Sequence, residues 1–198
     1  MKDQILIMLT VAMIGLTSNA IAAKKPDDPA KHTPWDLYVD SKEAYDLKLQ
    51  LGEKALFIDV RDPAEIKFTG FTDVVDINIP FKIANIKKWN DKKSSIGMDK
   101  NPNFITDIEN ALTSKNLSKD DAVIIMCRSG GTRGAPAANV LFKKGFKKVY
   151  VVTDGFEGGT LKKGENKGWR LKNGWKNSGL PWSYKLNKEK MYYSNSFK

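Results

Sequence analysis

The stretch Val123-Ile124-Ile125-Met126-Cys127-Arg128-Ser129-Gly130-Gly131-Thr132-Arg133-Gly134 decides most of what the sequence reveals about the fold. Its apolar start is typical of a buried strand, its middle of a tight basic turn, and its end of the first turn of a helix. Such a turn directs several backbone N–H groups, a helix N-terminus and two guanidinium groups toward one spot. The segment therefore predicts an anion-binding loop that begins at Cys127.

Cys127 is the only cysteine among the 198 residues. An ordinary cysteine is only about 3% thiolate at pH 7, and a loop that solvates the anion could raise this fraction roughly thirtyfold. A buried, inert thiol is the alternative, but the position at the head of a glycine-rich turn favours a nucleophile. The only histidine, His32, lies in a segment expected to be flexible, and one cysteine with one histidine cannot form a structural zinc site. We therefore expect activation by the loop itself, with no metal and no cofactor.

Residues 1–23 have the pattern of a secretory signal peptide. Lys2 precedes an apolar run over 5–16, and Ala20-Ile21-Ala22 supplies a small-x-small cleavage site. A membrane anchor is the alternative, but the run is shorter than the roughly 20 residues that a span needs. We expect a periplasmic or secreted protein that is not stably inserted in a membrane after cleavage. An unpaired thiol in an oxidising compartment again favours reactive chemistry.

The formal net charge of +10 would suit nucleic acid, anionic lipid or a small anionic substrate. An exported protein rarely meets nucleic acid, and no recognition motif accompanies the lysines. We expect no nucleic-acid partner and a mostly solvated basic surface that steers small anions.

Apolar strands alternate with amphipathic helices between residues 35 and 159, after a flexible lead-in over 24–34. The expected strands cover 37–39, 55–60, 74–79, 122–126 and 148–153. The expected helices cover 42–51, with Ser41 as its N-cap, 105–117 and 136–144, and a further helix starts at Pro63. This alternation predicts an α/β fold with an open, parallel, five-stranded sheet and helices on both faces. Ligands bind beyond the carboxyl ends of such strands, so Asp59, Cys127 and Thr153 should border one face.

Two stretches fit this scheme poorly. Residues 82–100 are rich in Lys, Asn and Asp, and their expected apolar anchors are Ile83, Ile86, Trp89 and Ile96. Residues 160–198 form a basic, aromatic-rich C-terminal extension. We expect an irregular segment packed on the domain through its aromatic side chains. A rim over the active site or a docking surface for a partner is the alternative.

Charged residues also follow the other strands. We interpret Asp59, Arg61 and Glu65 as an ion pair or cap that fixes a turn. The alternative is that they act as acid–base catalysts. Asp154 and Glu157 either stabilise the last turn or border the pocket. Ser129 and Thr132 are expected to donate hydrogen bonds to the loop or to its anion, and Gly130 and Gly131 to let the backbone curl.

These motifs together resemble the rhodanese-like sulfurtransferase family. The resemblance rests on five ordered segments: Asp59-Val60-Arg61-Asp62-Pro63-Ala64-Glu65, Asp76-Ile77-Asn78-Ile79-Pro80, Cys127-Arg128-Ser129-Gly130-Gly131, Ala137-Ala138-Asn139 and Val152-Thr153-Asp154-Gly155-Phe156. It covers roughly residues 35–159 and is greatest for exported single-domain members.

The resemblance implies a sulfurtransferase. Cys127 would take the outer sulfur of thiosulfate or a similar anionic donor, hold it as a persulfide and pass it to cyanide or a thiol. Arg128, Ser129, Gly130, Gly131, Thr132 and Arg133 would bind the substrate, with the two arginines facing the departing sulfite.

The sequence departs from the family pattern in loop length. Five residues separate Cys127 from Arg133, whereas common sulfurtransferase loops bring the second arginine one residue sooner. This longer spacing also occurs in cysteine phosphatases and some arsenate reductases, which remain the alternative together with a non-catalytic binding module. The glycines of the loop favour a sulfurtransferase, and an exported arsenate reductase would lack its reducing partners. Phe71 stands where family members often have histidine, a position that is normally structural.

Overall fold

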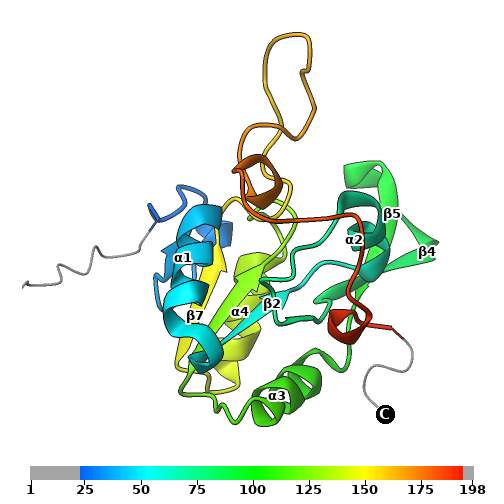
Figure 1. Cartoon of the computed structure of the whole chain (residues 1–198). Helices are drawn as coiled ribbons and strands as arrows, with labels where there is room; N and C mark the ends of the chain where they lie inside the picture. The colour runs from blue at the N-terminus through cyan, green and yellow to red at the C-terminus, as the bar shows by residue number, and fades with distance from the viewer. Residues whose placement is uncertain (1–22, 194–198) are drawn as a thin grey trace, which may run out of the picture.

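The computed structural model describes residues 23–193 (Figure 1). The predicted signal peptide, apart from Ala23, lies outside the described residues. Within this part of the chain, none of the helices has the length and apolar character required to cross a membrane.

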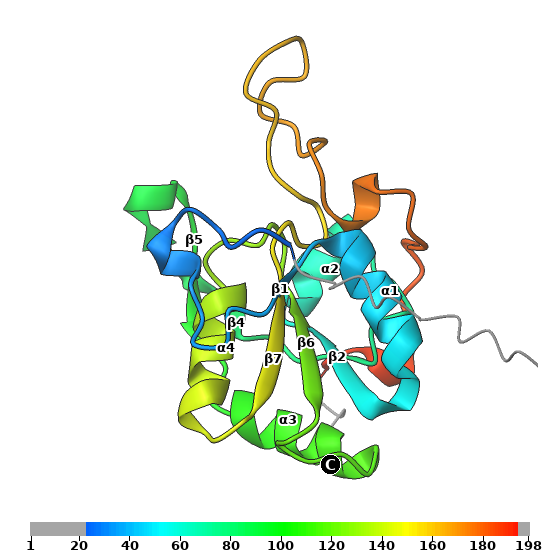
Figure 2. The ribbon, with the colours of Figure 1, turned by 90° about the vertical axis from the view of Figure 1, so that its left-hand side faces the viewer.

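A five-stranded parallel sheet forms the centre of the molecule (Figure 2). Its strand order is β1-β7-β6-β2-β3, and every neighbouring pair is parallel. In chain order the strands are β1 (Tyr38–Val39), β2 (Ala55–Asp59), β3 (Ile77–Asn78), β6 (Ala122–Met126) and β7 (Lys148–Val152). The predicted α/β class and parallel sheet are thus confirmed.

Four α-helices cover the two faces of this sheet: α1 (Ser41–Leu51), α2 (Pro63–Thr69), α3 (Phe104–Ser114) and α4 (Gly134–Lys143). Side chains of α3 and α4 share one buried cluster, and those of α1 and α2 share the other. Successive residues of a strand point to opposite faces, so the central strands are apolar throughout. Cys127 follows the parity of Val123 and Ile125 and belongs to the cluster on the α3–α4 face.

Two predicted boundaries differ from the structure for identifiable reasons. The strand expected over 74–79 is reduced to β3, because the Asp76 carboxylate accepts the N–H of Phe57 at 2.7 Å where a longer strand would supply a carbonyl. The cap of α1 is Asp40 and not Ser41. Asp40 and Glu43 form a reciprocal capping box, which leaves the Ser41 hydroxyl for another contact.

Residues 82–100 form a β-hairpin that is separate from the main sheet. Its strands are β4 (Lys82–Asn90) and β5 (Ser95–Lys100), joined by the 3₁₀ turn Asp91–Lys93. The prediction that apolar side chains anchor this segment was wrong for Ile86, Trp89 and Ile96, which are 84%, 63% and 48% exposed. The hairpin is held at its base instead, where the Asp62 carboxylate accepts the N–H of Ala84.

The chain after β7 first leaves the body of the molecule as a protruding loop and then returns across the α1–α2 face (Figure 1). Trp175 is fully buried there, with its ring 5.9 Å from that of Tyr45 and 5.7 Å from that of Phe57. Trp169 and Tyr184, which were also expected to anchor this segment, are exposed. Short 3₁₀ turns complete the fold: Pro29–Lys31, Gly52–Lys54, Trp175–Asn177 and Lys188–Lys190.

Candidate active site

The loop between β6 and α4 has a shape that two glycines make possible. Gly130 has a φ of +60°, and a Cβ atom there would lie 1.5 Å from the carbonyl oxygen of Thr153. Gly155, at a φ of +65°, approaches the loop from the turn after β7, and its Cβ would lie 2.5 Å from the carbonyl oxygen of Cys127. Two hydrogen bonds join these turns, because the N–H groups of Phe156 and Glu157 donate at 2.8 Å to the carbonyls of Cys127 and Arg128. The loop is therefore held from one side by the turn after β7.

Cys127 lies at the start of this loop and is only 2% exposed. Its sulfur is 3.7 Å from the position that a Cβ on Gly134 would occupy, which places it beside the first turn of α4. This N-terminus carries partial positive charge and favours an anion on the sulfur.

The N–H groups of the loop differ from the sequence expectation in one respect. No loop N–H forms a hydrogen bond to the Cys127 sulfur among the described residues, so the predicted ring of donors around the thiol itself is not seen. The N–H groups of residues 128–132 have no other acceptor in this part of the chain either. They remain available to a group bound above the sulfur. The hydroxyls of Ser129 and Thr132 likewise make no hydrogen bond within the described residues, so they do not support the loop.

Arg133 is buried and bound to Glu65 by two hydrogen bonds of 2.7 and 2.9 Å. Glu65 is the third residue of α2, so this pair joins the loop to the opposite layer of the fold. Burial by itself lowers the pKa of Arg133, but the hydrogen bonds and charge of Glu65 outweigh it and raise the pKa above its usual value. The charge of Arg133 is therefore largely neutralised by the protein.

Arg128 and Arg170 meet at a second carboxylate. The Nε of Arg128 lies 2.5 Å from Glu157, and that of Arg170 lies 4.0 Å from the same oxygen. Arg170 also donates to the carbonyl of Gly158 at 2.7 Å. Partial burial and the nearby charge of Arg128 lower the pKa of Arg170. Glu157 is not among the residues that line the pocket, but it offsets the charge of two arginines that are.

Asp59 and Arg61 have the structural role that was predicted. Both side chains are fully buried and paired at 2.6 Å. The guanidinium also donates to Thr69 and to the carbonyl of Gly70, and it lies 3.9 Å from the centre of the Phe156 ring. The pair therefore fixes the chain between β2 and α2 and does not line the pocket.

Asp154 connects the last turn to both α1 and the C-terminal segment. Its carboxylate accepts hydrogen bonds from the Ser41 hydroxyl at 2.7 Å and from the Gly174 N–H at 2.9 Å. Burial raises its pKa, although both hydrogen bonds act in the opposite direction. Asp154 is thus a structural connector between distant segments.

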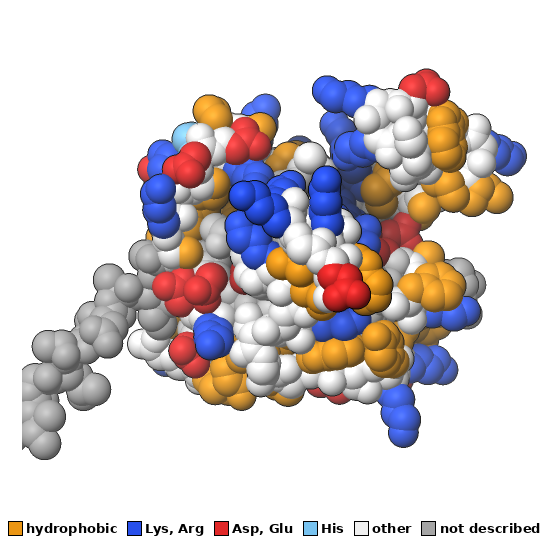
Figure 3. Space-filling view, turned by 90° about the horizontal axis from the view of Figure 1, so that it is seen from above, with side chains coloured by type: hydrophobic (Ala, Val, Ile, Leu, Met, Phe, Trp, Pro, Cys, Tyr) orange, Lys and Arg blue, Asp and Glu red, His pale blue; other side chains and the backbone are white. Residues whose placement is uncertain are grey.

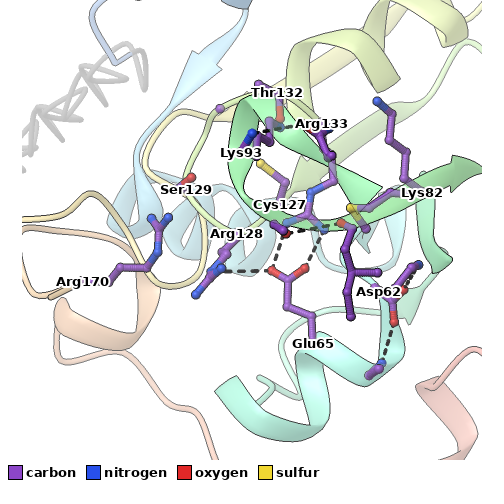
Figure 4. Close-up of a pocket in the computed structure, with 17 residues that line it drawn as sticks. Asp62, Glu65, Lys82, Lys93, Cys127, Arg128, Ser129, Thr132, Arg133 and Arg170 are labelled. Carbon is purple, nitrogen blue, oxygen red and sulfur yellow. Dashed lines mark hydrogen bonds and ion pairs between the residues drawn. The ribbon is translucent and has the colours of Figure 1, made fainter. Parts of the chain in front are cut away.

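A pocket of about 680 Å³ opens above Cys127 (Figure 4). Six of the seven predicted site residues line it, and Gly130, which is buried against the carbonyl of Thr153, does not. Figure 4 shows Glu65 between Arg128 and Arg133, with Lys82 on the hairpin and Arg170 on the C-terminal segment. The lining comprises Asp62, Ala64, Glu65, Lys82, Ala84, Asn90, Lys93, Ser95, Ile96, Met98, Cys127, Arg128, Ser129, Gly131, Thr132, Arg133 and Arg170.

The hairpin wall and Arg170 were not predicted as site residues. A rim over the active site was only the alternative for residues 160–198, and the position of Arg170 in the lining agrees with it. For the hairpin, the one signal was that residues 82–100 did not fit the alternating pattern. Five cationic side chains and two carboxylates line the pocket, which gives it a positive balance suited to an anion. Among the residues that the structure describes, no group of three or more His, Cys, Asp or Glu side chains could hold a metal ion.

Comparisons with known proteins agree with this arrangement. The sequence pattern of the Rhodanese-like domain family matches residues 43–162. The uncharacterized protein RP600 of Rickettsia prowazekii is 31% identical over 144 residues, which cover 73% of this chain and 94% of that protein. A homologue from Rickettsia rickettsii is 28% identical over the same coverage.

A solved structure, that of Rv0390 from M. tuberculosis, is also similar. Its sequence identity is 25%, its TM-score is 0.55, and the match covers 75% of this chain and 97% of the other. With the parallel sheet, the loop at Cys127 and the family match over most of the sheet, the chain belongs to the rhodanese-like domain family.

Proposed function

We propose that the protein is a sulfurtransferase in which Cys127 carries the transferred sulfur as a persulfide. The observation that supports this most is the position of Cys127: its sulfur lies beside the N-terminus of α4, at the base of a cationic pocket. The unpaired N–H groups of residues 128–132 can solvate an anionic sulfur bound above the thiol.

The first half of the reaction takes sulfur from an anionic donor such as thiosulfate. The Cys127 thiolate attacks the outer sulfur, the sulfur–sulfur bond of thiosulfate breaks, and sulfite leaves with the electron pair. The positive pocket attracts the dianion and offsets the charge of the leaving sulfite.

The second half returns the enzyme to its starting state. Cyanide or a thiolate attacks the outer sulfur of the persulfide, and the Cys127 thiolate leaves with the electron pair. No proton acceptor other than solvent is needed for an acceptor that is already anionic. This suits a site whose lining holds no histidine.

The ion pair of Arg133 with Glu65 bears on the alternative of a phosphatase or an arsenate reductase, in which Arg133 would bind a tetrahedral oxyanion. Two of the five N–H groups of the Arg133 guanidinium already donate to Glu65, which leaves fewer of them for an oxyanion. This pairing supports a sulfur anion solvated by backbone N–H groups.

The decisive experiment is intact mass measurement after incubation with thiosulfate. We expect a gain of one sulfur atom, about 32 Da, that cyanide removes and that the Cys127→Ser variant does not show. Vanadate-sensitive hydrolysis of para-nitrophenyl phosphate without this adduct would replace the proposal by a phosphatase. Absence of both reactions would leave a binding module.

Export belongs to the same proposal and is supported by the pattern of residues 1–23 alone. N-terminal sequencing of protein recovered from the periplasm or medium tests it. A mature N-terminus near Lys24 is expected, and recovery of the intact leader in the cytoplasm would contradict export.

A further inference from the structure

The pocket above Cys127 is much larger than thiosulfate or cyanide requires. Its volume of about 680 Å³ falls within the range of roughly 300–1,000 Å³ that is typical of pockets for drug-sized ligands. The additional space is bounded by the β4–β5 hairpin and by Arg170, not by the loop that surrounds the thiol. The shape therefore indicates that one co-substrate is larger than an inorganic ion.

The charges of the pocket fall into two zones. Near the thiol, Arg133 and Arg128 are each paired with a carboxylate, Glu65 and Glu157. In the outer zone, Lys82 and Lys93 of the hairpin have no carboxylate partner among the described residues. These unpaired ammonium groups are the ones that a carboxylate on a bound molecule can approach without displacing a protein carboxylate.

An apolar strip lies beside these lysines. Ile96 and Met98 are two residues apart on β5 and share a face, and Ala84 is the cross-strand partner of Met98. All three line the pocket, yet Ile96 is 48% and Met98 36% exposed. The face seen from above carries clustered Lys and Arg side chains with hydrophobic side chains beside them (Figure 3). Such a wall fits a molecule with both carboxylates and an aliphatic chain.

The hairpin is held where it meets the site. Asp62 caps α2 through the N–H of Ala64 at 2.7 Å and accepts the N–H of Ala84 with its other oxygen. Glu65, which pairs with Arg133, lies on the same first turn of α2. The lysine-bearing wall is thus fixed relative to the thiol and can contribute to selectivity.

We propose that the β4–β5 hairpin selects, as sulfur acceptor, a peptide-sized thiol that carries carboxylates. Lys82 and Lys93 bind the carboxylates, and Ile96 with Met98 contacts the aliphatic part. The acceptor thiolate attacks the outer sulfur of the Cys127 persulfide, the Cys127 thiolate leaves with the electron pair, and the acceptor becomes a persulfide. This inference rests on the proposed sulfurtransferase function.

The test uses two acceptor peptides of equal size, acetyl-Glu-Cys-Glu-amide and acetyl-Gln-Cys-Gln-amide. The protein is incubated with thiosulfate to form the persulfide and then freed of excess donor. The loss of the extra sulfur atom is followed by intact mass at increasing peptide concentration. Rates are compared per thiolate, because the flanking charges alter the ionisation of the peptide thiol. We expect the acidic peptide to react about tenfold faster at low salt, with the advantage falling as ionic strength rises.

A matched pair of double variants assigns the effect to the pocket. Lys82→Gln/Lys93→Gln removes two charges that line the pocket, and Lys87→Gln/Lys92→Gln removes two from the same hairpin outside it. The first should abolish most of the preference for the acidic peptide, and the second should retain it. Transfer to cyanide should change less than threefold in the Lys87→Gln/Lys92→Gln variant, and the Lys82→Gln/Lys93→Gln variant is judged by the ratio of its rates with the two peptides.

Equal rates for the two peptides, or equal losses in the two double variants, would overturn the proposal. If no persulfide forms, the proposed sulfurtransferase function fails, but the selectivity of the pocket can still be tested. Binding of the two S-methylated peptides to the unloaded protein is then compared. Preferential binding of the acidic peptide that depends on Lys82 and Lys93 would support the selective pocket. Equal binding of both peptides would refute it.

Discussion

The pair formed by Glu65 and Arg133 should stabilise the fold as much as it shapes the site. Its two hydrogen bonds of 2.7 and 2.9 Å join α2 to the loop, and the side chains are 17% and 10% exposed. Opposite charges about 4 Å apart attract by about 4 kcal/mol at an effective dielectric constant near 20. Removing one partner of a fully buried pair costs about 3–5 kcal/mol, and the residual solvent access here lowers this to about 2–3 kcal/mol.

We therefore expect Glu65→Gln to lower the unfolding free energy by about 2–3 kcal/mol, which for a chain of this size lowers Tm by about 4–12 °C. Urea and thermal unfolding of the protein at neutral pH measure this loss of stability. Glu109→Gln is the matched control, because Glu109 pairs with Lys119 at 2.7 Å but both side chains are 41% exposed. That change should cost no more than about 1 kcal/mol.

The double variant Glu65→Gln/Arg133→Gln tests whether the loss arises from the interaction. It should lose about 1–2 kcal/mol less than the sum of the two single variants, because each single variant leaves one buried charge without its partner and the double variant leaves none. A Glu65→Gln variant as stable as Glu109→Gln, or single losses that add to within about 0.5 kcal/mol, would refute the reasoning.

Three further changes test other parts of the structure. Gly130→Ala should lower the unfolding free energy in urea by more than about 3 kcal/mol, because its Cβ would lie 1.5 Å from a carbonyl oxygen. Gly145→Ala is the control: with a φ of +85° and no atom within 4 Å, it should show only the smaller cost of backbone strain. Equal losses in the two variants would contradict a steric requirement at Gly130. Trp175→Ala should cost about 3–5 kcal/mol and Trp169→Ala less than about 1 kcal/mol, since only the former ring is buried, and similar Tm values would exclude Trp175 as an anchor. The raised pKa of Asp154 means that the folded state binds the proton more tightly than the unfolded state. The stability of the wild type relative to Asp154→Asn should therefore increase as the pH falls from about 7 toward the ordinary aspartate pKa. Urea unfolding at several pH values measures this difference in stability, and a difference that stays constant with pH would contradict the prediction.

The sequence by itself determined the sheet and the position of the nucleophile. Short apolar runs rich in β-branched residues and bounded by turn residues indicate strands buried on both faces, and a glycine-rich segment after one of them indicates a tight turn, so both features are local. The same holds for Asp62 and Pro63 at the start of α2, where the cap and the fixed φ act within a few residues. These elements were predicted to within one or two residues, apart from the short strand β3 and the end of α3, which was expected at residue 117 and lies at Ser114.

Only the tertiary structure decided what surrounds the nucleophile. Glu65 and Arg133 are 68 residues apart, and Arg128 and Glu157 are 29 apart. Whether an arginine faces a substrate or a carboxylate of the protein therefore depends on how α2 and the last turn pack around the loop. The hairpin wall escaped prediction for a related reason. Its apolar side chains lie exposed beside the pocket and not in a hydrophobic core. Hydrophobic periodicity in a sequence indicates which side chains are buried, but it does not identify the pocket that an exposed side chain lines.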